Sequence, residues 1–321
     1  MLSVLVPTRN RAALWRSAWL LDSLRAQTEP PDELVIALDH TEDRTLELIT
    51  ADLSHDPAPF PVRILEVLAP QATPHPASGI PDNCLFHAAA GDVILHVDDD
   101  ISLPPDFCRR TRVLFTGLPS AILWAQHSFV DDHKTPLPGN DGRDCRAWLA
   151  EKHRWPLLPG GITELPKQQQ LHWGAVWTAT ARDLRRIGGH NLAHCGWHNT
   201  DTRLGKRLIR TLHASYVTST PEMTVLHQGK TWHAQNCHNP AVIRAAQGTT
   251  GGPRIANGGP DFWKSTWFDS AYVLTTTIPG TTMQLACGPR PVGLVRPHAQ
   301  LNPTTSPGRT ARTLLPTRRP K

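Results

Sequence analysis

Residues 91–107 read GDVILHVDDDISLPPDF, and this stretch decides the fold. The apolar run Val93–Val97 predicts a strand, and three consecutive aspartates, Asp98 to Asp100, follow at its carboxyl end. The two prolines after them predict a loop that leads into the next helix. Ligands of open α/β sheets gather at the carboxyl ends of the strands, so we expect the acidic triplet to lie at a functional edge.

Strand and helix patterns alternate on both sides of this stretch. Apolar runs at Leu2–Val6, Leu34–Leu38 and Val62–Val67 predict strands, and the segments 12–27, 43–53, 81–90 and 104–115 predict helices. Further along, a strand over 173–180, a helix over 181–187 and a helix over 201–212 are predicted, with a loop-rich segment over 131–170 before them. This alternation predicts an α/β fold with a single Rossmann-like, doubly wound, mostly parallel sheet flanked by helices.

The formal charge of +5 comes from the end of the chain. No acidic residue follows Asp269, and seven basic residues do, so subtracting seven from +5 leaves about −2 for residues 1–269. The folded part therefore carries no general basic excess, and we predict no nucleic-acid binding. Residues 281–321 are rich in Pro, Thr and Arg and poor in large apolar groups, so we predict a disordered basic tail.

The location of the protein is predicted from its termini and cysteines. The first seven residues already reach a polar segment, and no later run approaches the roughly 20 apolar residues of a spanning helix. The six cysteines form no CxxC pair, which favours reduced thiols. We expect a cytoplasmic protein, with peripheral membrane contact through the basic tail left open.

Three adjacent carboxylates at a strand end need compensation by a cation or by hydrogen bonds. Mn²⁺ or Mg²⁺ takes carboxylate oxygens and commonly completes its shell with substrate phosphate, so the triplet suits a nucleoside diphosphate. The alternative is a solvated acidic turn. A nucleotidyltransferase or phosphohydrolase site is also compatible with the triplet alone.

Five segments together carry a family resemblance. They are LSVLVPTRNR at 2–11, ELVIALDHTEDRT at 33–45, the stretch 91–107, WGAVWTATARDLRRIGGHN at 173–191 and CGWHNTDTRLGKRL at 195–208. Their order and spacing resemble family 2 glycosyltransferases, of the nucleotide-diphospho-sugar transferase superfamily with the GT-A fold. The resemblance covers about residues 2–230. It implies a catalytic domain over 1–240, with a nucleotide-binding half (1–118) and an acceptor half (119–240), and then a C-terminal extension over 241–280.

The resemblance implies roles for residues of the nucleotide-binding half. It places the following residues at the nucleotide: Pro7, Thr8, Arg9, Asn10, Asp39 and Asp98. Asp98 and Asp100 match the DxD acids, with Asp100 as a metal ligand and Asp98 at the ribose or the metal. His227 matches a histidine that completes the metal shell, and a neutral imidazole is a suitable ligand for Mn²⁺; the alternative is an ordinary loop histidine.

In the acceptor half, the resemblance makes Asp201 the base that removes the acceptor proton. Thr200 stands where the family's motif has Glu, which is a departure from the pattern. A helix-capping role for Asp201 is the alternative, since an Asp cap stabilises by ~1 kcal/mol. Trp173 and Trp197 flank the glycine-rich segment and offer flat faces for a sugar ring, and with Gly188 and Gly189 they complete the predicted acceptor site.

These observations predict a metal-dependent glycosyltransferase that moves a sugar from a nucleotide-diphosphate donor to a hydroxyl of a carbohydrate, lipid or other acceptor, with inversion. Two alternatives stay open at this stage. The Thr200 departure is compatible with a catalytically weakened protein that binds nucleotide sugar or carbohydrate. The acidic triplet is compatible with a metal-dependent nucleotidyltransferase.

Overall fold

The computed structural model describes the chain over residues 1–39, 41–67, 79–131, 133–135, 157–158, 162–164, 175–190, 200–212, 214–219, 221–228 and 273–275. The predicted tail over 281–321 lies outside these residues, and of the extension over 241–280 only 273–275 are included. Trp173 and Trp197 also lie outside them. In the described part of the chain, no helix is long and apolar enough to cross a membrane.

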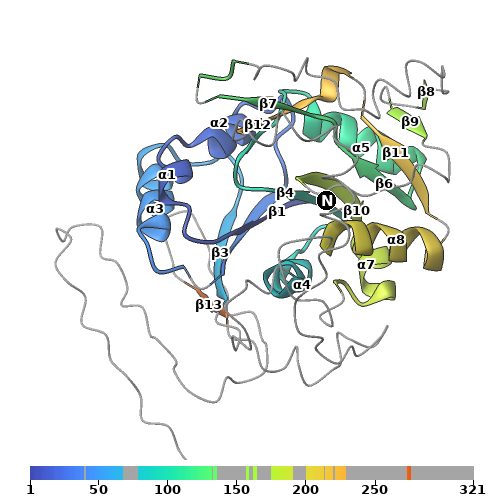
Figure 1. The fold of residues 1–321 in the computed structure, drawn as a ribbon, viewed down its shortest axis with the longest axis horizontal. Coiled ribbons are helices and arrows are strands. Elements are labelled where there is room, and N and C mark those ends of the chain that lie inside the picture. The colour runs from blue at the N-terminus through green and yellow to red at the C-terminus, as the bar shows by residue number, and fades with distance from the viewer. Residues whose placement is uncertain are drawn as a thin grey trace, which may run out of the picture.

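A large twisted sheet forms the centre of the molecule (Figure 1). Its strand order is β13-β3-β2-β1-β4-β10-β6-β11-β9-β8. The strands are β1 (Leu2–Thr8), β2 (Glu33–Asp39), β3 (Val62–Val67), β4 (Val93–Val97), β6 (Ala121–Trp124), β8 (Leu157–Leu158), β9 (Ile162–Glu164), β10 (Val176–Thr180), β11 (Ser215–Thr218) and β13 (Val273–Thr275).

The first four long strands, β3, β2, β1 and β4, are neighbours and run parallel. This confirms the predicted mostly parallel, doubly wound sheet. β10 then runs antiparallel between β4 and β6, and β11 is parallel to β6. The described strands after residue 119 that belong to this sheet therefore continue it with mixed directions.

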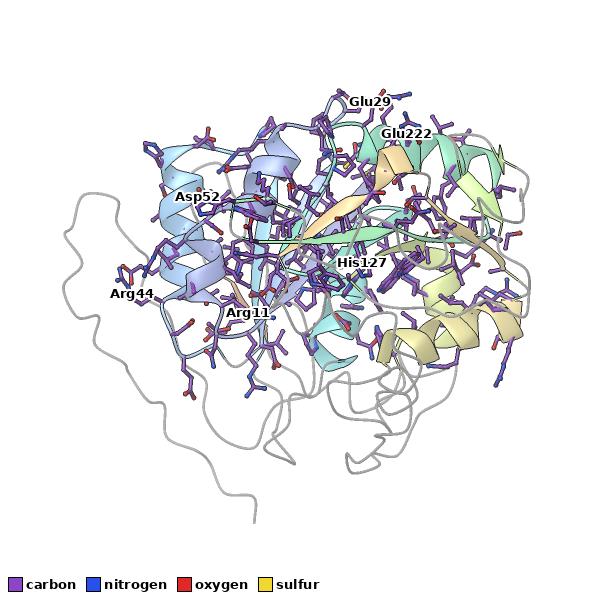
Figure 2. The ribbon with its side chains drawn as sticks, turned by 45° about the horizontal axis from the view of Figure 1, so that its top comes forward. Arg11, Glu29, Arg44, Asp52, His127 and Glu222 are labelled. Carbon is purple, nitrogen blue, oxygen red and sulfur yellow. The ribbon has the colours of Figure 1, made fainter. Side chains whose placement is uncertain are left out.

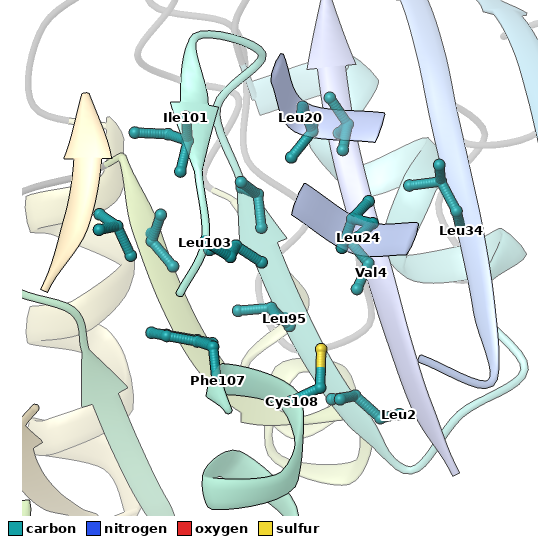
Figure 3. Packing of buried hydrophobic residues seen from close by; sticks show 14 of the residues in the cluster. Leu2, Val4, Leu20, Leu24, Leu34, Leu95, Ile101, Leu103, Phe107 and Cys108 are labelled. Carbon is teal, nitrogen blue, oxygen red and sulfur yellow. The ribbon is translucent and has the colours of Figure 1, made fainter. Parts of the chain in front are cut away.

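Both faces of the parallel strands are buried because apolar residues occupy both sets of alternating positions. On β1, Val4 and Val6 belong to the cluster on one face, and Leu5 belongs to the cluster on the other. Figure 3 shows the first cluster, in which Leu20, Leu24 and Phe107 are contributed by helices. The helices of this face are α2 (Trp19–Arg25), α3 (Thr45–His55) and α5 (Phe107–Gly117); those of the second face are α4 (Gly79–Ala88), α7 (Ala181–Ile187) and α8 (Thr200–Leu212).

The single helix predicted over 12–27 is wrong. The structure has two short helices, α1 (Ala12–Trp15) and α2, separated at Ala18, whose φ of 51° is left-handed and therefore interrupts the helix. Trp15 is buried, and its indole Nε1 donates to Thr8 Oγ1 at 2.9 Å. The break turns the chain, so that Trp15 anchors the loop after β1 while α2 packs against the core.

A second, three-stranded sheet lies beside the carboxyl end of β4. It has the order β5-β12-β7, formed by β5 (Ile101–Ser102), β12 (Val225–Gln228) and β7 (His127–Val130). The short helix η2 (Pro221–Met223) precedes β12. This sheet brings residues after 220 next to the acidic triplet, which β5 directly follows in the chain.

Gly91 provides a test of how tightly β1 and β4 are joined. A Cβ added there would lie 2.5 Å from Ser3 Oγ and 2.9 Å from Met1 O and from Ser3 N, and two of these three are backbone atoms. Gly91 N also donates to Ser3 Oγ, which in turn donates to the buried Glu33. We expect Gly91→Ala to lower the free energy of unfolding by about 1–3 kcal/mol, the usual cost of overpacking a close-packed site.

Gly117→Ala is the matched control for this substitution. A Cβ at Gly117, the last residue of α5, meets no atom within 4 Å. It should be neutral or raise stability by up to ~1 kcal/mol, because alanine restricts the unfolded chain. Urea denaturation of both variants measures the difference, and equal midpoints would contradict the close approach of β1 and β4.

Candidate nucleotide and metal site

The candidate site forms where β1, β2 and β4 end. Because these strands are parallel and adjacent, Thr8, Asp39 and the residue after Val97 reach the same edge of the sheet. Thr8 is paired in register with Leu38, one residue before Asp39. The structure therefore brings the predicted nucleotide-binding loop and the acidic triplet together at the carboxyl edge, where ligands bind in such sheets.

The middle aspartate of the triplet points back into the protein. Asp99 Oδ2 accepts a hydrogen bond from Thr8 Oγ1 at 2.5 Å, and the side chain of Asp99 is only 6% exposed. Burial raises the pKa of Asp99 to about 6, although the Arg11 guanidinium opposes this shift. Asp99 thus joins the end of β4 to the end of β1. This structural role is consistent with its middle position in the predicted DxD motif.

Arg11 is the residue at this edge that sequence reasoning missed. It lies in the loop between β1 and α1 and is labelled in Figure 2. Its Nε is 3.6 Å from Asp99 Oδ1, and its Nη2 is 3.8 Å from Asp100 Oδ2. Its side chain is 35% exposed, so the guanidinium compensates the triplet while still reaching the surface. Arg11 ends the segment LSVLVPTRNR, but a basic residue after a strand carries no distinguishing signal in the sequence.

Asp100 and His227 form a close pair. His227 Nε2 lies 3.2 Å from Asp100 Oδ1, and the two side chains are 17% and 14% exposed. Burial disfavours the charge on Asp100, but His227 and Arg11 outweigh it and hold the carboxyl pKa below its usual value. Burial also disfavours the charged imidazole, but Asp100, with a further contribution from Asp98, raises the His227 pKa. The three predicted metal ligands, Asp98, Asp100 and His227, are therefore linked electrostatically through His227.

Backbone pairing fixes this geometry. His227 of β12 is in register with Ile101 of β5, and Gln228 N donates to Asp100 O at 2.9 Å. On the other side of β12, His127 of β7 lies with its ring 5.5 Å from that of His227 at 74°. His127 is also labelled in Figure 2. The imidazole of His227 is therefore held by strands on both sides, which is unlike the ordinary loop histidine of the alternative interpretation.

The predicted nucleotide-binding residues Arg9 and Asp39 lie together. Arg9 Nη1 is 3.5 Å from Asp39 Oδ2, and Asp39 is buried at the end of β2. Asn10 has a φ of 50°, and its Oδ1 accepts hydrogen bonds from the backbone N–H groups of Glu42 and Asp43. Pro7 is half-buried within β1. Asn10 therefore links the loop after β1 to the loop after β2, next to the Arg9–Asp39 pair.

The acceptor side is described in part. Gly188 and Gly189 have φ values of 72° and 64°, and their N–H groups bond to carbonyls of α7, so they end that helix. This capping role does not test the predicted acceptor contact. Asp201 is the second residue of α8, in its first turn, and its side chain lies outside the described part.

The donor atoms of Asp100 and His227 suit a divalent metal ion. Carboxylate oxygen and imidazole nitrogen are suitable ligands for Mn²⁺, and Asp100 and His227 offer one of each within 3.2 Å. His227 Nδ1 has no hydrogen-bond partner among the described residues. In the same part of the chain, no three His, Cys, Asp or Glu side chains are gathered closely enough to hold a metal by themselves. A metal at this pair fits only if a bound ligand, such as a diphosphate, completes its shell.

The fold is an α/β fold with a mostly parallel sheet, and charged and polar side chains gather at its carboxyl edge. The sequence profile of glycosyl transferase family 2 matches residues 3–164, which is 162 of the 321 residues. The chain belongs to this family. The matched region contains the predicted nucleotide-binding loop, Asp39 and the acidic triplet. Among proteins with curated descriptions, none matches the chain significantly.

A solved structure of a mannosyltransferase shows the same fold. The mannosyltransferase PcManGT from Pyrobaculum calidifontis, in complex with GDP-Man and Mn²⁺, superposes with a TM-score of 0.51 at 18% identity, covering 79% of this chain and 65% of that one. S. aureus TarS 1-349 in complex with UDP-GlcNAc gives a TM-score of 0.49 at 16% identity, covering 71% of this chain and 58% of that one. The chain spans 38% of the longer S. aureus TarS structure.

Proposed function

We propose that the protein transfers a sugar from a nucleotide-diphosphate donor to a hydroxyl acceptor, with a divalent metal and with inversion. The observation that carries the proposal is the meeting of Thr8, Asp39, Asp100 and His227 at one sheet edge in a chain of glycosyl transferase family 2. The GDP-Man and Mn²⁺ in the mannosyltransferase complex support the same donor class and a divalent metal.

The donor would lie along the edge from β2 to β4. Arg9 follows β1 and Asp39 ends β2, so they offer a guanidinium and a carboxylate to the nucleoside. Asp98, Asp100 and His227 would hold Mn²⁺ or Mg²⁺ together with the diphosphate, and the ion would offset the negative charge that develops on the leaving group. Arg11, with its exposed guanidinium, would add a second positive charge at the same phosphates.

The acceptor would approach from the side of α8. Asp201 would take the proton of the acceptor hydroxyl, whose oxygen bonds to the anomeric carbon as the carbon–oxygen bond to the diphosphate breaks. The bonding electrons leave with the nucleoside diphosphate on the opposite face of the sugar, which gives inversion. Gly188, Gly189, Trp173 and Trp197 would border the acceptor.

A screen of nucleotide sugars tests the proposal. Thermal stabilisation by one donor class that increases with Mn²⁺, followed by release of the nucleoside diphosphate with a hydroxyl acceptor, is the expected result. Binding without turnover would replace the proposal with the weakened binding protein that Thr200 suggests. Release of pyrophosphate would indicate nucleotidyl transfer.

Replacing Arg11 is expected to change the affinities for Mn²⁺ and for the nucleoside diphosphate in opposite directions. Arg11→Gln removes a positive charge from Asp99 and Asp100, so Mn²⁺ alone should bind up to roughly 10-fold more tightly. The nucleoside diphosphate should bind more weakly, because its phosphates lose a cationic partner. Calorimetry with each ligand separately measures both effects. Arg16→Gln, an exposed arginine after α1, is the control; a fall in both affinities in Arg11→Gln would show that Arg11 only holds the loop.

A further inference from the structure

A line of buried polar contacts begins on the strand that carries the acidic triplet. His96 of β4 points to the face opposite the first core cluster, and its ring stacks on Trp177 of β10 at 4.9 Å and 8°. His96 Nε2 lies 3.0 Å from Asp82 Oδ1 of α4. The other carboxylate oxygen of Asp82 lies 3.3 Å from His190 Nε2. His96, Asp82 and His190 are 2%, 4% and 1% exposed, so one carboxylate joins two imidazoles in the interior.

The next residue of α4 binds the backbone of His190. Asn83 Oδ1 accepts from His190 N at 2.7 Å, and Asn83 Nδ2 donates to His190 O at 3.1 Å. Both groups are buried, and 107 residues separate them in sequence. Phe86, one turn further along α4, stacks on the His190 ring at 5.5 Å and 16°. The turn that ends α7 therefore contacts α4 in three ways. The backbone of His190 binds Asn83, its imidazole contacts the carboxylate of Asp82, and its ring face stacks on Phe86.

The same turn is bound from the other side by α8. Arg207 Nη1 donates to Gly189 O at 2.7 Å, and Arg207 Nη2 donates to Ile187 O. These carbonyls lie at the carboxyl end of α7, where a cation also interacts favourably with the helix dipole. Figure 1 shows α7 and α8 side by side on this face of the sheet. The contacts thus continue from β4 through α4 and the 188–190 turn to α8.

Apolar packing alone does not fix α8 in one place. Leu204 and Leu208 are each 1% exposed and seat the helix against the second core cluster. Such contacts are not directional, so they define the axial position and the rotation of the helix less sharply than hydrogen bonds do. A planar guanidinium shared between two carbonyls defines both the axial position and the rotation of the helix. Burying these polar groups is costly unless each is paired, so a displaced helix would leave the carbonyls unsatisfied.

We propose that Arg207, together with Asn83, His190 and the Asp82–His96 pair, is a positioning device that sets α8 relative to β4. The proposal rests on the proposed function, because its consequence is the placement of the first turn of α8, with Asp201, relative to the triplet that follows β4. The two ends of the line lie close to these residues in the chain: His96 is two residues before Asp98, and Arg207 is six residues after Asp201.

The test compares Arg207→Met with Arg207→Lys and with Arg210→Met, an exposed arginine three residues further along α8. Arg207→Met keeps an unbranched, flexible stem but is shorter and removes every donor. We expect its kcat to fall by roughly 10-fold or more, since misplacement of about 1 Å can cost as much as 10²-fold, while the Kd for the donor stays at the wild-type value. Arg207→Lys keeps one donor group and should recover part of kcat, and Arg210→Met should match the wild type.

Amide hydrogen exchange on the full chain provides a readout that does not require turnover. Arg207→Met should speed exchange in the amides of 200–206 and leave those of 93–97 unchanged, whereas a general loss of stability would speed both. Unchanged exchange in α8, or normal kcat in Arg207→Met with an active wild type, would overturn the positioning role. A wild type that transfers no sugar, with the exchange difference still present, would instead overturn the proposed function alone.

Discussion

Replacing Asp100 with alanine is expected to lower Mn²⁺-dependent donor affinity by about 100-fold or more. Mutation of a residue that only holds a metal ligand in place typically lowers metal affinity about 10- to 100-fold. Asp100 is itself one of two close side-chain donors, so its loss should lower the affinity by at least the upper value. The fold should remain intact. A neutral His227 imidazole needs no counter-charge once Asp100 is removed, and Arg11 keeps Asp99 as a partner.

Isothermal titration calorimetry of the donor, with and without Mn²⁺, measures this effect. Asp92→Ala is the matched control, because Asp92 precedes the same strand at its opposite end and its side chain is 92% exposed. The control should bind like the wild type and melt within a few degrees of it. Metal-dependent binding that is unchanged in Asp100→Ala would remove Asp100 from the metal site.

Replacing Asp201 with asparagine is expected to lower kcat by roughly 10²-fold or more, the usual scale for a positioned acid or base. Asparagine keeps the size and most of the hydrogen bonding of aspartate but does not accept the acceptor's proton. The Kd for the donor should stay near the wild-type value, because the proton is removed only as the acceptor attacks. Steady-state kinetics and donor titration on the same preparation separate the two quantities.

The alternative is that Asp201 only stabilises α8. Asp201 lies in the first turn of this helix, where a carboxylate interacts favourably with the helix dipole by about 0.3–1 kcal/mol. A purely structural Asp201 would therefore give a slightly lower melting temperature in Asp201→Asn with nearly normal kcat. Asp201→Glu provides a further comparison, since it keeps the charge but moves the carboxylate. It should retain stability and lose part of kcat if the position of the base matters.

Elements with strong local signals could be predicted from the sequence to the residue. β3 and β4 are rich in buried apolar and β-branched residues, and their bounds match the prediction. α7 matches as well, since Thr180 accepts a hydrogen bond from Asp183 N at its start and Gly188 ends it. β6 and β7 were not predicted. They are short, and their pairing depends on partners about 50 to 100 residues away, a contact for which no local pattern exists.

The candidate site was predicted unevenly for similar reasons. Strand ends place Asp39 and the triplet at one edge, so this part follows from the pattern of strands. The proximity of His227 to Asp100 followed only from the family resemblance, because β12 reaches β5 across the second sheet. Arg11 gave no distinguishing signal, since a basic residue after a strand is usually a solvated loop charge. Its place beside Asp99 and Asp100 is apparent only from the distances in the structure.

The late position of β12 in the chain has a consequence for the order in which the site is assembled. The four parallel strands and the triplet lie within the first 100 residues, whereas His227 follows Asp100 by 127 residues. At about 5–20 residues per second, a ribosome adds the histidine roughly 6 to 25 seconds after the aspartate. Arg11, from the first loop, is synthesised before either. During that interval, Arg11 is the positive charge already available to Asp99 and Asp100. The imidazole of His227 is therefore added to a group of carboxylates that already has a cation beside it.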